Sequence, residues 1–189
     1  MTTGDESPSA CDYLVIGAGA TGMAFCDTLL HHTSTSSTPP TVVLADKHDR
    51  PGGHWNDSYS FVALHQPSRG YGVESERLEP VGDPNADTHR GTRDEILDYY
   101  SAVQQKLESR FNFRFVGGTW FDMNQLGGSG SEGVYQLQSQ SSDGATSIRV
   151  RKKGWMLGIL SPICPSLLAP NSPTTMPSSN AFQSMNCPL

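Results

Sequence analysis

The feature that most constrains this chain is a short apolar strand that runs directly into a glycine-rich turn. Residues 13–22 read Tyr-Leu-Val-Ile-Gly-Ala-Gly-Ala-Thr-Gly, and a helical pattern continues at residues 23–30. In a G-x-G-x-x-G turn, Gly17 allows the tight bend, Gly19 lets a pyrophosphate approach the backbone, and Gly22 lets the helix pack closely on the strand. The motif therefore predicts a turn that binds a dinucleotide.

The backbone amides of this segment explain why such a turn binds phosphate. The amides at the start of the helix, including those of Ala20 and Thr21, have no partner within the helix, and the helix dipole adds positive charge there. A motif this short also occurs in ordinary glycine-rich turns. The choice between the two interpretations depends on the residues farther along the chain.

A second apolar run, at residues 41–46, ends in an acid. Asp46 lies somewhat farther beyond Gly22 than the roughly 20 residues expected of an acid that hydrogen-bonds an adenosine ribose. The polar loop 31–40 accounts for the extra length, because it extends the connection between helix and strand. We interpret Asp46 as a ribose ligand; the alternative is a solvated carboxylate at the end of a strand.

A pair of glycines comes after that acid, since residues 50–55 read Arg-Pro-Gly-Gly-His-Trp. A simple NAD dehydrogenase has no need of a glycine pair here, whereas flavoproteins built from two dinucleotide folds have one where the chain crosses close to the cofactor. In that interpretation Gly52, Gly53 and Trp55 lie at the middle of the cofactor. The alternatives are a plain turn and a tryptophan of the core.

With these motifs the chain resembles the FAD/NAD(P)-binding oxidoreductases, and among them the flavin-containing and Baeyer–Villiger monooxygenases, whose equivalent segment reads Gly-Gly-x-Trp. The resemblance covers residues 12–153. It implies FAD as the cofactor and NAD(P)H as co-substrate in complete family members, and it leaves the catalytic residues unknown. It also places His65 near the flavin, where the alternative is a surface loop. The residues expected to bind the cofactor are Gly17, Gly19, Ala20, Thr21, Gly22, Asp46, Lys47, Arg50, Gly52, Gly53, Trp55 and His65.

A capping box marks the start of a second helix. Thr92 and Glu95 stand three residues apart, so that the hydroxyl serves the amide of Glu95 and the carboxylate reaches back to the amide of Thr92. The apolar spacing after this box predicts a helix over residues 93–109. The residues expected on its buried face are Ile96, Tyr99 or Tyr100, Val103 and Leu107.

The remaining segments predict strands separated by irregular chain. Residues 47–90 are rich in Gly, Pro and polar residues, with one short strand expected at 61–64. Strands are also expected at 111–122, 133–140 and 146–152, because apolar residues alternate there and Gly-rich turns separate them. We interpret these three as an antiparallel meander. The fold class predicted is therefore α/β, a Rossmann-like FAD-binding fold with a parallel sheet and an inserted antiparallel β-meander, incomplete in this chain.

Three regions differ in composition. Residues 1–10 form an acidic, polar lead-in that we expect to be disordered, and residues 11–153 form a partial FAD-binding domain. Residues 154–189 contain no Asp, Glu, Lys, Arg or His, and they contain six prolines. Because a folded surface carries charge and regular elements tolerate few prolines, we interpret this uncharged tail as disordered or as the product of a frame shift.

The frame-shift interpretation depends on two residues that have one codon each. Trp155 and Met156 are encoded by TGG and ATG, and reading one base earlier gives a hydrophobic residue followed by Asp-Ala if Leu157 has a CTN codon. That product resembles the strand end expected at this point of the family's fold. The alternative is a genuine disordered extension, and the transcript sequence decides between them.

Composition excludes several classes of partner. The net charge of −6 and the pI near 5.4 give no support for nucleic-acid binding, and no apolar run reaches the length of a membrane span. The polar start is unlike a secretory signal, so we expect a cytoplasmic protein without a membrane partner. The cysteines have no metal-binding spacing, no metal site is expected, and Cys11 and Cys26 are expected to be small buried residues.

Three functions remain open from the sequence. The first is an FAD-dependent oxidoreductase of monooxygenase type that acts on an unknown small molecule. The second is a non-catalytic remnant that keeps a dinucleotide-binding half-domain, because a second G-x-G-x-x-G in the strand-to-helix context of an NADPH site is not found. The third is a small NAD(P)-dependent reductase, in which Lys47 and Arg50 would accept a 2′-phosphate only if Asp46 turned away.

Overall fold

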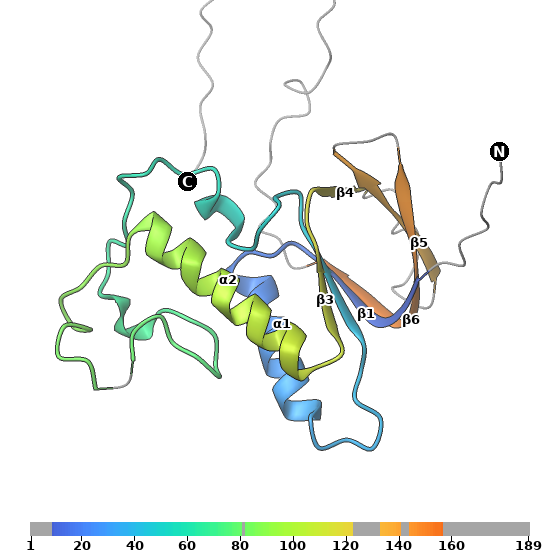
Figure 1. The fold of residues 1–189 in the computed structure, drawn as a ribbon, viewed down its shortest axis with the longest axis horizontal. Helices are drawn as coiled ribbons and strands as arrows, with labels where there is room; N and C mark the ends of the chain where they lie inside the picture. The colour runs from blue at the N-terminus through green and yellow to red at the C-terminus, as the bar shows by residue number, and fades with distance from the viewer. Residues whose placement is uncertain (1–8, 81, 123–132, 141–143, 157–189) are drawn as a thin grey trace, which may run out of the picture. The chain divides into compact units, whose positions relative to one another are not determined.

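The computed structural model describes residues 9–80, 82–122, 133–140 and 144–156 (Figure 1). All of them belong to one compact unit, Met1–Gly158. The elements are β1 (Ser9–Ile16), α1 (Ala20–Thr33), β2 (Val42–Ala45), the 3₁₀ turns η1 (Gly53–Trp55) and η2 (Ser68–Gly70), α2 (Arg93–Arg110), β3 (Phe113–Val116), β4 (Thr119–Phe121), β5 (Gly133–Ser139) and β6 (Ala145–Met156).

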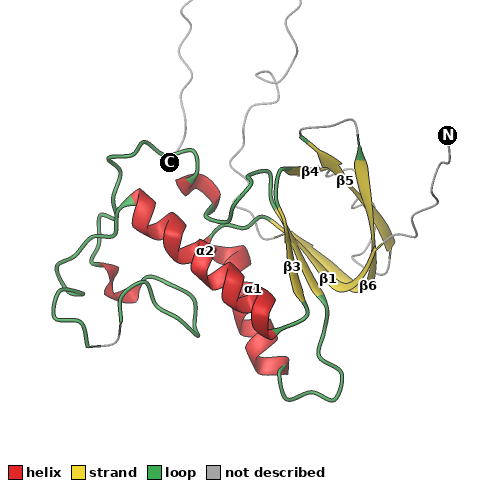
Figure 2. Ribbon diagram, viewed as in Figure 1, coloured by secondary structure: helices red, strands yellow, loops and turns green. Residues whose placement is uncertain are grey.

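The described strands form one six-stranded sheet in the order β3-β2-β1-β6-β5-β4. Neighbours from β3 to β6 pair in parallel, whereas β5 pairs with β6 and β4 with β5 in antiparallel fashion. Both long helices lie on one side of the parallel part of the sheet (Figure 2). This arrangement confirms the predicted α/β class and the Rossmann-like, mostly parallel sheet.

The central strand β2 is buried on both faces, as its apolar sequence requires. All four residues of β2 are buried: Val42 and Leu44 pack toward the helices, while Val43 and Ala45 face the other side. The opposite face packs against side chains of β5 and β6, among them Leu137. Cys11 and Cys26 are fully buried, which confirms their expected role, and burial raises the pKa of the Cys11 thiol to about 11.

The predicted strand 111–122 is wrong as a single element. The chain divides it into β3, which pairs with β2, and β4, which pairs with β5. The break falls at Gly117 and Gly118, where a Cβ on Gly117 would lie 2.8 Å from the carbonyl oxygen of His48 and Gly118 has a φ of 62°. Two glycines allow this close crossing, so the meander consists of β4, β5 and β6.

The third predicted strand, 146–152, continues farther than expected. β6 extends to Met156, and its last residues pair in parallel with β1, from Tyr13 opposite Lys153 to Ile16 opposite Met156. One strand therefore belongs both to the meander and to the parallel sheet. The expected strand at 61–64 is also wrong, because the structure has only an isolated bridge there, between Ala63 and Thr92.

α2 confirms the predicted helix and its capping box. The hydroxyl of Thr92 accepts a hydrogen bond from the amide of Glu95. In return, a carboxylate oxygen of Glu95 accepts a hydrogen bond of 2.7 Å from the amide of Thr92. The two hydrogen bonds from Thr92 hold the pKa of Glu95 below its ordinary value. The buried residues include the whole predicted face: Ile96, Leu97, Tyr99, Tyr100, Val103 and Leu107.

The irregular segment 57–91 is fastened to α2 by buried polar groups. The hydroxyl of Tyr99 donates a hydrogen bond to the carbonyl of Glu76 and accepts one from the amide of Val73, both at 2.6 Å. Burial raises the pKa of Tyr99 to about 12, so the hydroxyl keeps its proton at neutral pH. Farther along, His89 lies between Glu79 and Glu95, 2.5 Å and 3.4 Å away.

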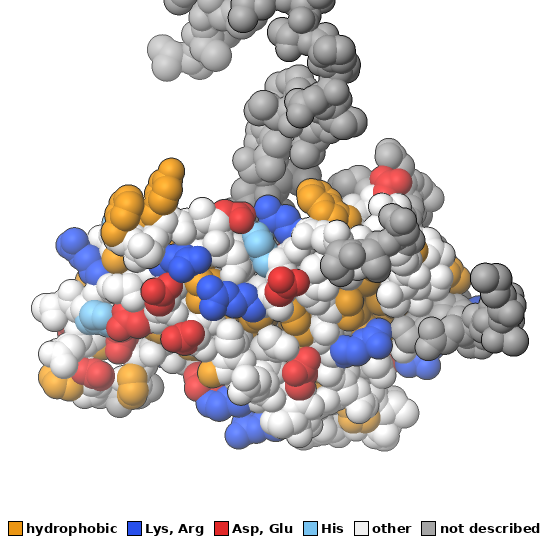
Figure 3. Space-filling model, turned by 45° about the horizontal axis from the view of Figure 1, so that its top comes forward, with side chains coloured by type: hydrophobic (Ala, Val, Ile, Leu, Met, Phe, Trp, Pro, Cys, Tyr) orange, Lys and Arg blue, Asp and Glu red, His pale blue; other side chains and the backbone are white. Residues whose placement is uncertain are grey.

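The surface is polar, with acidic and basic side chains interspersed and a few apolar side chains standing out from it (Figure 3). Exposed large apolar residues of the described part include Tyr59 and Phe61, whose rings stack with centroids 5.4 Å apart. Neither long helix combines the length and apolar character that crossing a bilayer requires, within the residues described.

Removing the cap of α2 tests its contribution to stability. We expect Thr92→Ala to lower the free energy of unfolding by about 1 kcal/mol, because the amide of Glu95 loses its acceptor and the carboxylate of Glu95 loses the hydroxyl that donates to it. Urea denaturation measures the change. Thr92→Ser keeps the hydroxyl and serves as the control; an equal loss in both variants would contradict the role of the hydroxyl.

His89 and the two carboxylates beside it, Glu79 and Glu95, form a clamp that makes the stability of the fold depend on pH. The hydrogen bond to Glu79, and the nearby charge of Glu95, raise the pKa of His89 above its ordinary value of 6.5. Its stabilising contribution is therefore complete below the unfolded pKa and disappears as the pH rises through the higher folded pKa.

We expect the melting temperature of His89→Gln to fall below that of the unchanged chain at about pH 5.5, and the gap to narrow by about pH 8.5. Thermal unfolding followed by circular dichroism measures both. His65→Gln, at an exposed histidine, is the control. A gap that widens as the pH rises would show that the clamp does not depend on the imidazolium.

Candidate dinucleotide-binding site

The candidate site lies where β1 and β2 end. β1 ends at Ile16, the glycine turn comes next, and α1 begins at Ala20, while β2 ends at Ala45 directly beside it (Figure 1). The amide of Gly17 donates to the carbonyl of Ala45 at 2.8 Å, so the two strand ends are joined. Open α/β sheets bind ligands at this edge, outside the carboxyl ends of their parallel strands.

The first glycine turn has the geometry that the sequence predicted. Gly17 has a φ of 103°, in the left-handed region that favours glycine. A Cβ on Gly22 would lie 1.9 Å from the carbonyl oxygen of Gly17, so only glycine fits against the turn. Gly19 caps α1 without a side chain, and Ala20 and Thr21 are exposed.

The start of α1 also has the charge that an anion requires. No acidic residue stands in its first turn, and the N-cap Gly19 has no side chain to cap its first amides. The amides and the positive end of the helix dipole therefore face this edge without a competing carboxylate on the helix itself.

Asp46 does something that the sequence did not predict. Only 7% of the residue is exposed, so its carboxylate is not the solvated group of the alternative interpretation. One carboxylate oxygen accepts a hydrogen bond from the amide of Ala18 at 2.6 Å. The other accepts a hydrogen bond from the amide of His48 and also contacts Nδ1 of that residue, both at 2.8 Å. Asp46 thus fastens the first glycine turn to the end of β2.

An ionised carboxylate has about four acceptor positions, so Asp46 keeps one beyond these three contacts. That remaining position is on Oδ2, the oxygen that already accepts from Ala18. The ribose contact expected of Asp46 stays a prediction, and the structure leaves an acceptor for it.

The second glycine turn packs directly against the first. Gly52 and Gly53 have φ of 129° and 55°, both in the left-handed region. The amide of Gly52 donates to the carbonyl of Ala18 at 2.8 Å. A Cβ on Gly53 would lie 2.7 Å from the Cα of Gly19, which is closer than real side chains approach. The two motifs, distant in sequence, therefore form one continuous stretch of bare backbone.

A chain of polar side chains joins the end of β2 to the residues after η1. The ring of His48 lies between Asp46 and Asp57, with Nε2 3.0 Å from the nearer oxygen of Asp57, and Lys47 lies 3.2 Å from the same carboxylate. Although partial burial opposes it, hydrogen bonds from His48 and Lys47 hold the pKa of Asp57 below its ordinary value. This chain fixes the second turn from its far side.

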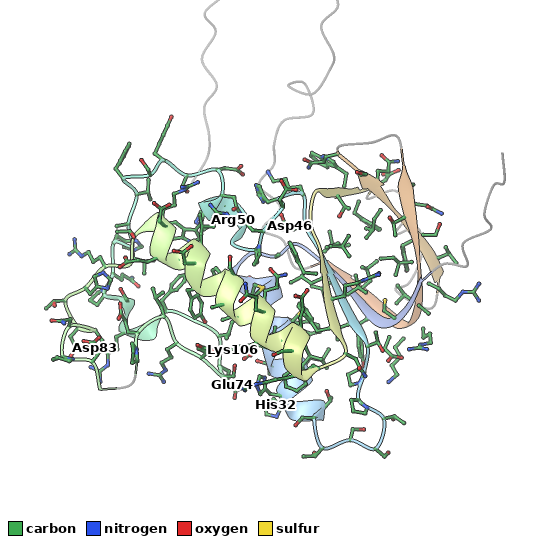
Figure 4. All side chains as sticks on the ribbon, in the orientation of Figure 1. His32, Asp46, Arg50, Glu74, Asp83 and Lys106 are labelled. Carbon is green, nitrogen blue, oxygen red and sulfur yellow. The ribbon has the colours of Figure 1, made fainter. Side chains whose placement is uncertain are left out.

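Three other predicted residues have different surroundings. Trp55 is 7% exposed and donates to the hydroxyl of Tyr71 at 2.9 Å, so it belongs to the core, as its alternative interpretation had it. Arg50 is exposed and donates to Asn56 at 3.2 Å; it lies at the same end of the sheet as Asp46 (Figure 4). His65 is exposed, and no described hydrogen bond or ion pair joins it to either glycine turn.

The sequence missed Ala18, His48 and Asp57 as parts of this arrangement, and also Arg93, whose guanidinium donates to the carbonyls of Trp55 and Asn56. Ala18 contributes only backbone groups, which its side chain does not reveal. The other three belong to loops or a helix end whose positions depend on the folded chain. The best signal in the sequence is His48, a basic residue two positions after Asp46. Its position alone does not predict that its ring turns back toward that acid.

Two cavities of the described part lie away from both turns. One, of about 350 Å³, lies between α1 and α2 and is lined by residues that include Asp27 and Lys106. The other, of about 650 Å³, is lined by α2 and residues 76–80. The candidate site is therefore defined by backbone geometry at an open edge. No cluster of His, Cys, Asp and Glu suited to a metal ion occurs among the described residues.

Comparison with known proteins gives relatives of unknown activity. No protein-family model matches the chain. Uncharacterised proteins of Mycobacterium tuberculosis and Mycobacterium bovis are each 43% identical over 110 residues, which is 56% of this chain and 20% of each relative. The chain thus spans about a fifth of the length of the curated relatives it matches.

Two solved structures align with most of this chain. A mutant flavin monooxygenase from Stenotrophomonas maltophilia aligns over 76% of this chain and 36% of its own, with 16% identity and a TM-score of 0.50. A cyclohexanone monooxygenase from Rhodococcus sp. Phi1, solved with NADP+, aligns over 77% of this chain and 25% of its own, with 25% identity and a TM-score of 0.47. The first of these two matches shows that the chain shares the Rossmann-like fold of that flavin monooxygenase.

The contact between the glycine turns can be tested by adding one methyl group. We expect Gly53→Ala to lower the free energy of unfolding by about 1–3 kcal/mol, because the Cβ would collide with the backbone of Gly19. Urea denaturation measures the loss.

Gly82→Ala is the matched control. Gly82 also has a left-handed φ, 91°, but a Cβ there would have nothing within 4 Å. It therefore reports backbone strain without a collision. If Gly53→Ala were no more harmful than Gly82→Ala, the two turns would not be packed as described.

Proposed function

We propose that this chain binds FAD through its adenosine and pyrophosphate, and that it is the cofactor-binding part of a flavin-dependent oxidoreductase of monooxygenase type. The observation that carries the proposal is the contact between the two glycine turns at the carboxyl edge of the sheet. A Cβ on Gly53 would fill the space against Gly19. Such bare backbone beside a helix start suits a pyrophosphate.

The donors and acceptors of the site fit the parts of the cofactor. The amides at the start of α1 would bind the pyrophosphate, and the remaining acceptor of Asp46 would bind the adenosine ribose. Gly52 and Gly53 would pass close to the middle of the dinucleotide, on the flavin side of its pyrophosphate. Trp55 would support that turn from the core, because its indole is directed to Tyr71.

In flavoenzymes the bound flavin supplies the redox chemistry, and the protein binds and orients it. The site accordingly needs no nucleophilic side chain. The residues of this chain would hold the cofactor at a fixed edge of the sheet. The reductant NAD(P)H and the substrate belong to the complete oxidoreductase in this proposal.

The geometry favours FAD over an NADP-type nucleotide at this site. A 2′-phosphate would require Asp46 to turn away, but its carboxylate is held by Ala18 and His48. Lys47 is paired with Asp57 and Arg50 with Asn56, so both cations already have partners. These contacts support the flavoprotein proposal against that of a small NADP-dependent reductase.

Titration of the purified chain with FAD, ADP and NADPH tests the proposal. We expect FAD and ADP to bind and NADPH to bind more weakly, as measured by isothermal titration calorimetry. Asp46→Asn should weaken ADP binding about tenfold or more, because hydrogen bonds to a charged acceptor are roughly twice as strong as neutral ones. Asp98→Asn, at an exposed acid of α2, is the control with the same change of charge.

Two outcomes would contradict the proposal. One is a folded preparation that binds neither FAD nor ADP. The other is an Asp46→Asn variant that binds ADP as tightly as the unchanged chain, since the carboxylate would then take no part in recognising the adenosine half.

A further inference from the structure

The first residue of α2 contacts the end of the second glycine turn. The Nε of Arg93 donates to the carbonyl of Trp55 at 3.1 Å, and its Nη2 donates to the carbonyl of Asn56 at 3.3 Å. Its third nitrogen pairs with Asp94 at 2.8 Å. One guanidinium thus holds two successive carbonyls at the point where η1 ends.

This position is an unfavourable one for a cation within the helix. The amino-terminal end of a helix has a positive partial charge, so a lysine or arginine there is destabilising unless something offsets it. Asp94 and Glu95, in the same first turn, provide that offset. The side chain of Arg93 is 21% exposed, which shows that it folds inward against η1 instead of extending into water.

Arg93 and Leu97 lie four residues apart, on one face of α2, and both support the same turn. A Cβ on Gly52 would lie 2.4 Å from the side chain of Leu97, so the helix packs directly behind the glycine pair. On the other side of the turn, the amide of Gly52 donates a hydrogen bond to the carbonyl of Ala18. The turn is therefore held between the first glycine turn and the start of α2.

The fork of an arginine matches this task better than a lysine does. A guanidinium presents several donors in a fixed plane, and it can bind two carbonyls at once, whereas an ammonium is a single flexible point charge. Arg93→Lys keeps the charge and most of the length but loses this paired geometry.

We propose that Arg93 is a positioning residue that fixes the second glycine turn for the flavin half of the dinucleotide, while the first turn and Asp46 serve the ADP half. The inference rests on the proposed function and divides its site into two parts. It predicts that one substitution separates the affinities for FAD and ADP, because ADP lacks the half that the second turn faces.

The test compares FAD and ADP binding by Arg93→Lys. We expect about a tenfold weaker affinity for FAD and a much smaller change in the affinity for ADP, which reaches the second turn only with its diphosphate. Arg110→Lys makes the same substitution at the other end of α2 and should change neither affinity. A purely structural role for Arg93 would weaken both ligands together, and an unchanged ratio of the two affinities would overturn the inference.

Hydrogen exchange of the ligand-free chain gives a second readout. In Arg93→Lys, we expect faster exchange in residues 52–58 and unchanged exchange in the buried part of α2, residues 96–107. Faster exchange throughout α2 would show that the variant unfolds the helix, and unchanged exchange in 52–58 would show that Arg93 does not hold the turn.

These results are distinct from failure of the proposed function. If the unchanged chain binds neither FAD nor ADP, the proposed function fails and the division of its site fails with it. If the unchanged chain binds both and Arg93→Lys keeps their ratio, the role of Arg93 alone is refuted.

Discussion

The close approach of two bare backbones, at Gly19 and Gly53, is the constraint on which the rest of the candidate site depends. Each turn alone is an ordinary feature of a loop. Together they leave a stretch of bare backbone at this edge of the sheet, bordered by the positive start of α1. The surrounding contacts, from Ala18 to Gly52 and from Leu97 behind it, all serve to keep these backbones at that distance.

Asp46 connects this edge to the sheet. It accepts hydrogen bonds from the first turn and from His48, and His48 in turn contacts Asp57 after the second turn. A carboxylate expected to serve a ligand thus also maintains the site in which that ligand would lie. Both roles are compatible because a carboxylate has about four acceptor positions, and the contacts with Ala18 and His48 use three of them.

The sequence predicted the elements whose cause is local. The capping box of Thr92 and Glu95 and the apolar spacing after it predicted α2 and its buried face, and the glycine motif predicted the turn after β1. Prediction failed where the cause is a distant neighbour. The segment 111–122 begins with alternating apolar residues at 111–115, yet it divides at Gly117 because that backbone crosses close to the carbonyl of His48.

Taken by itself, the sequence determined that this chain would form an α/β fold with a glycine turn between a buried strand and a helix. These features depend on the spacing of apolar residues and on glycines close together in the chain, so their causes are local. Only the tertiary structure decided that the second turn meets the first, that Trp55 belongs to the core, and that Arg93 reaches the carbonyls of η1. Those contacts join residues far apart in the chain, and their geometry exists only once the sheet and α2 have packed.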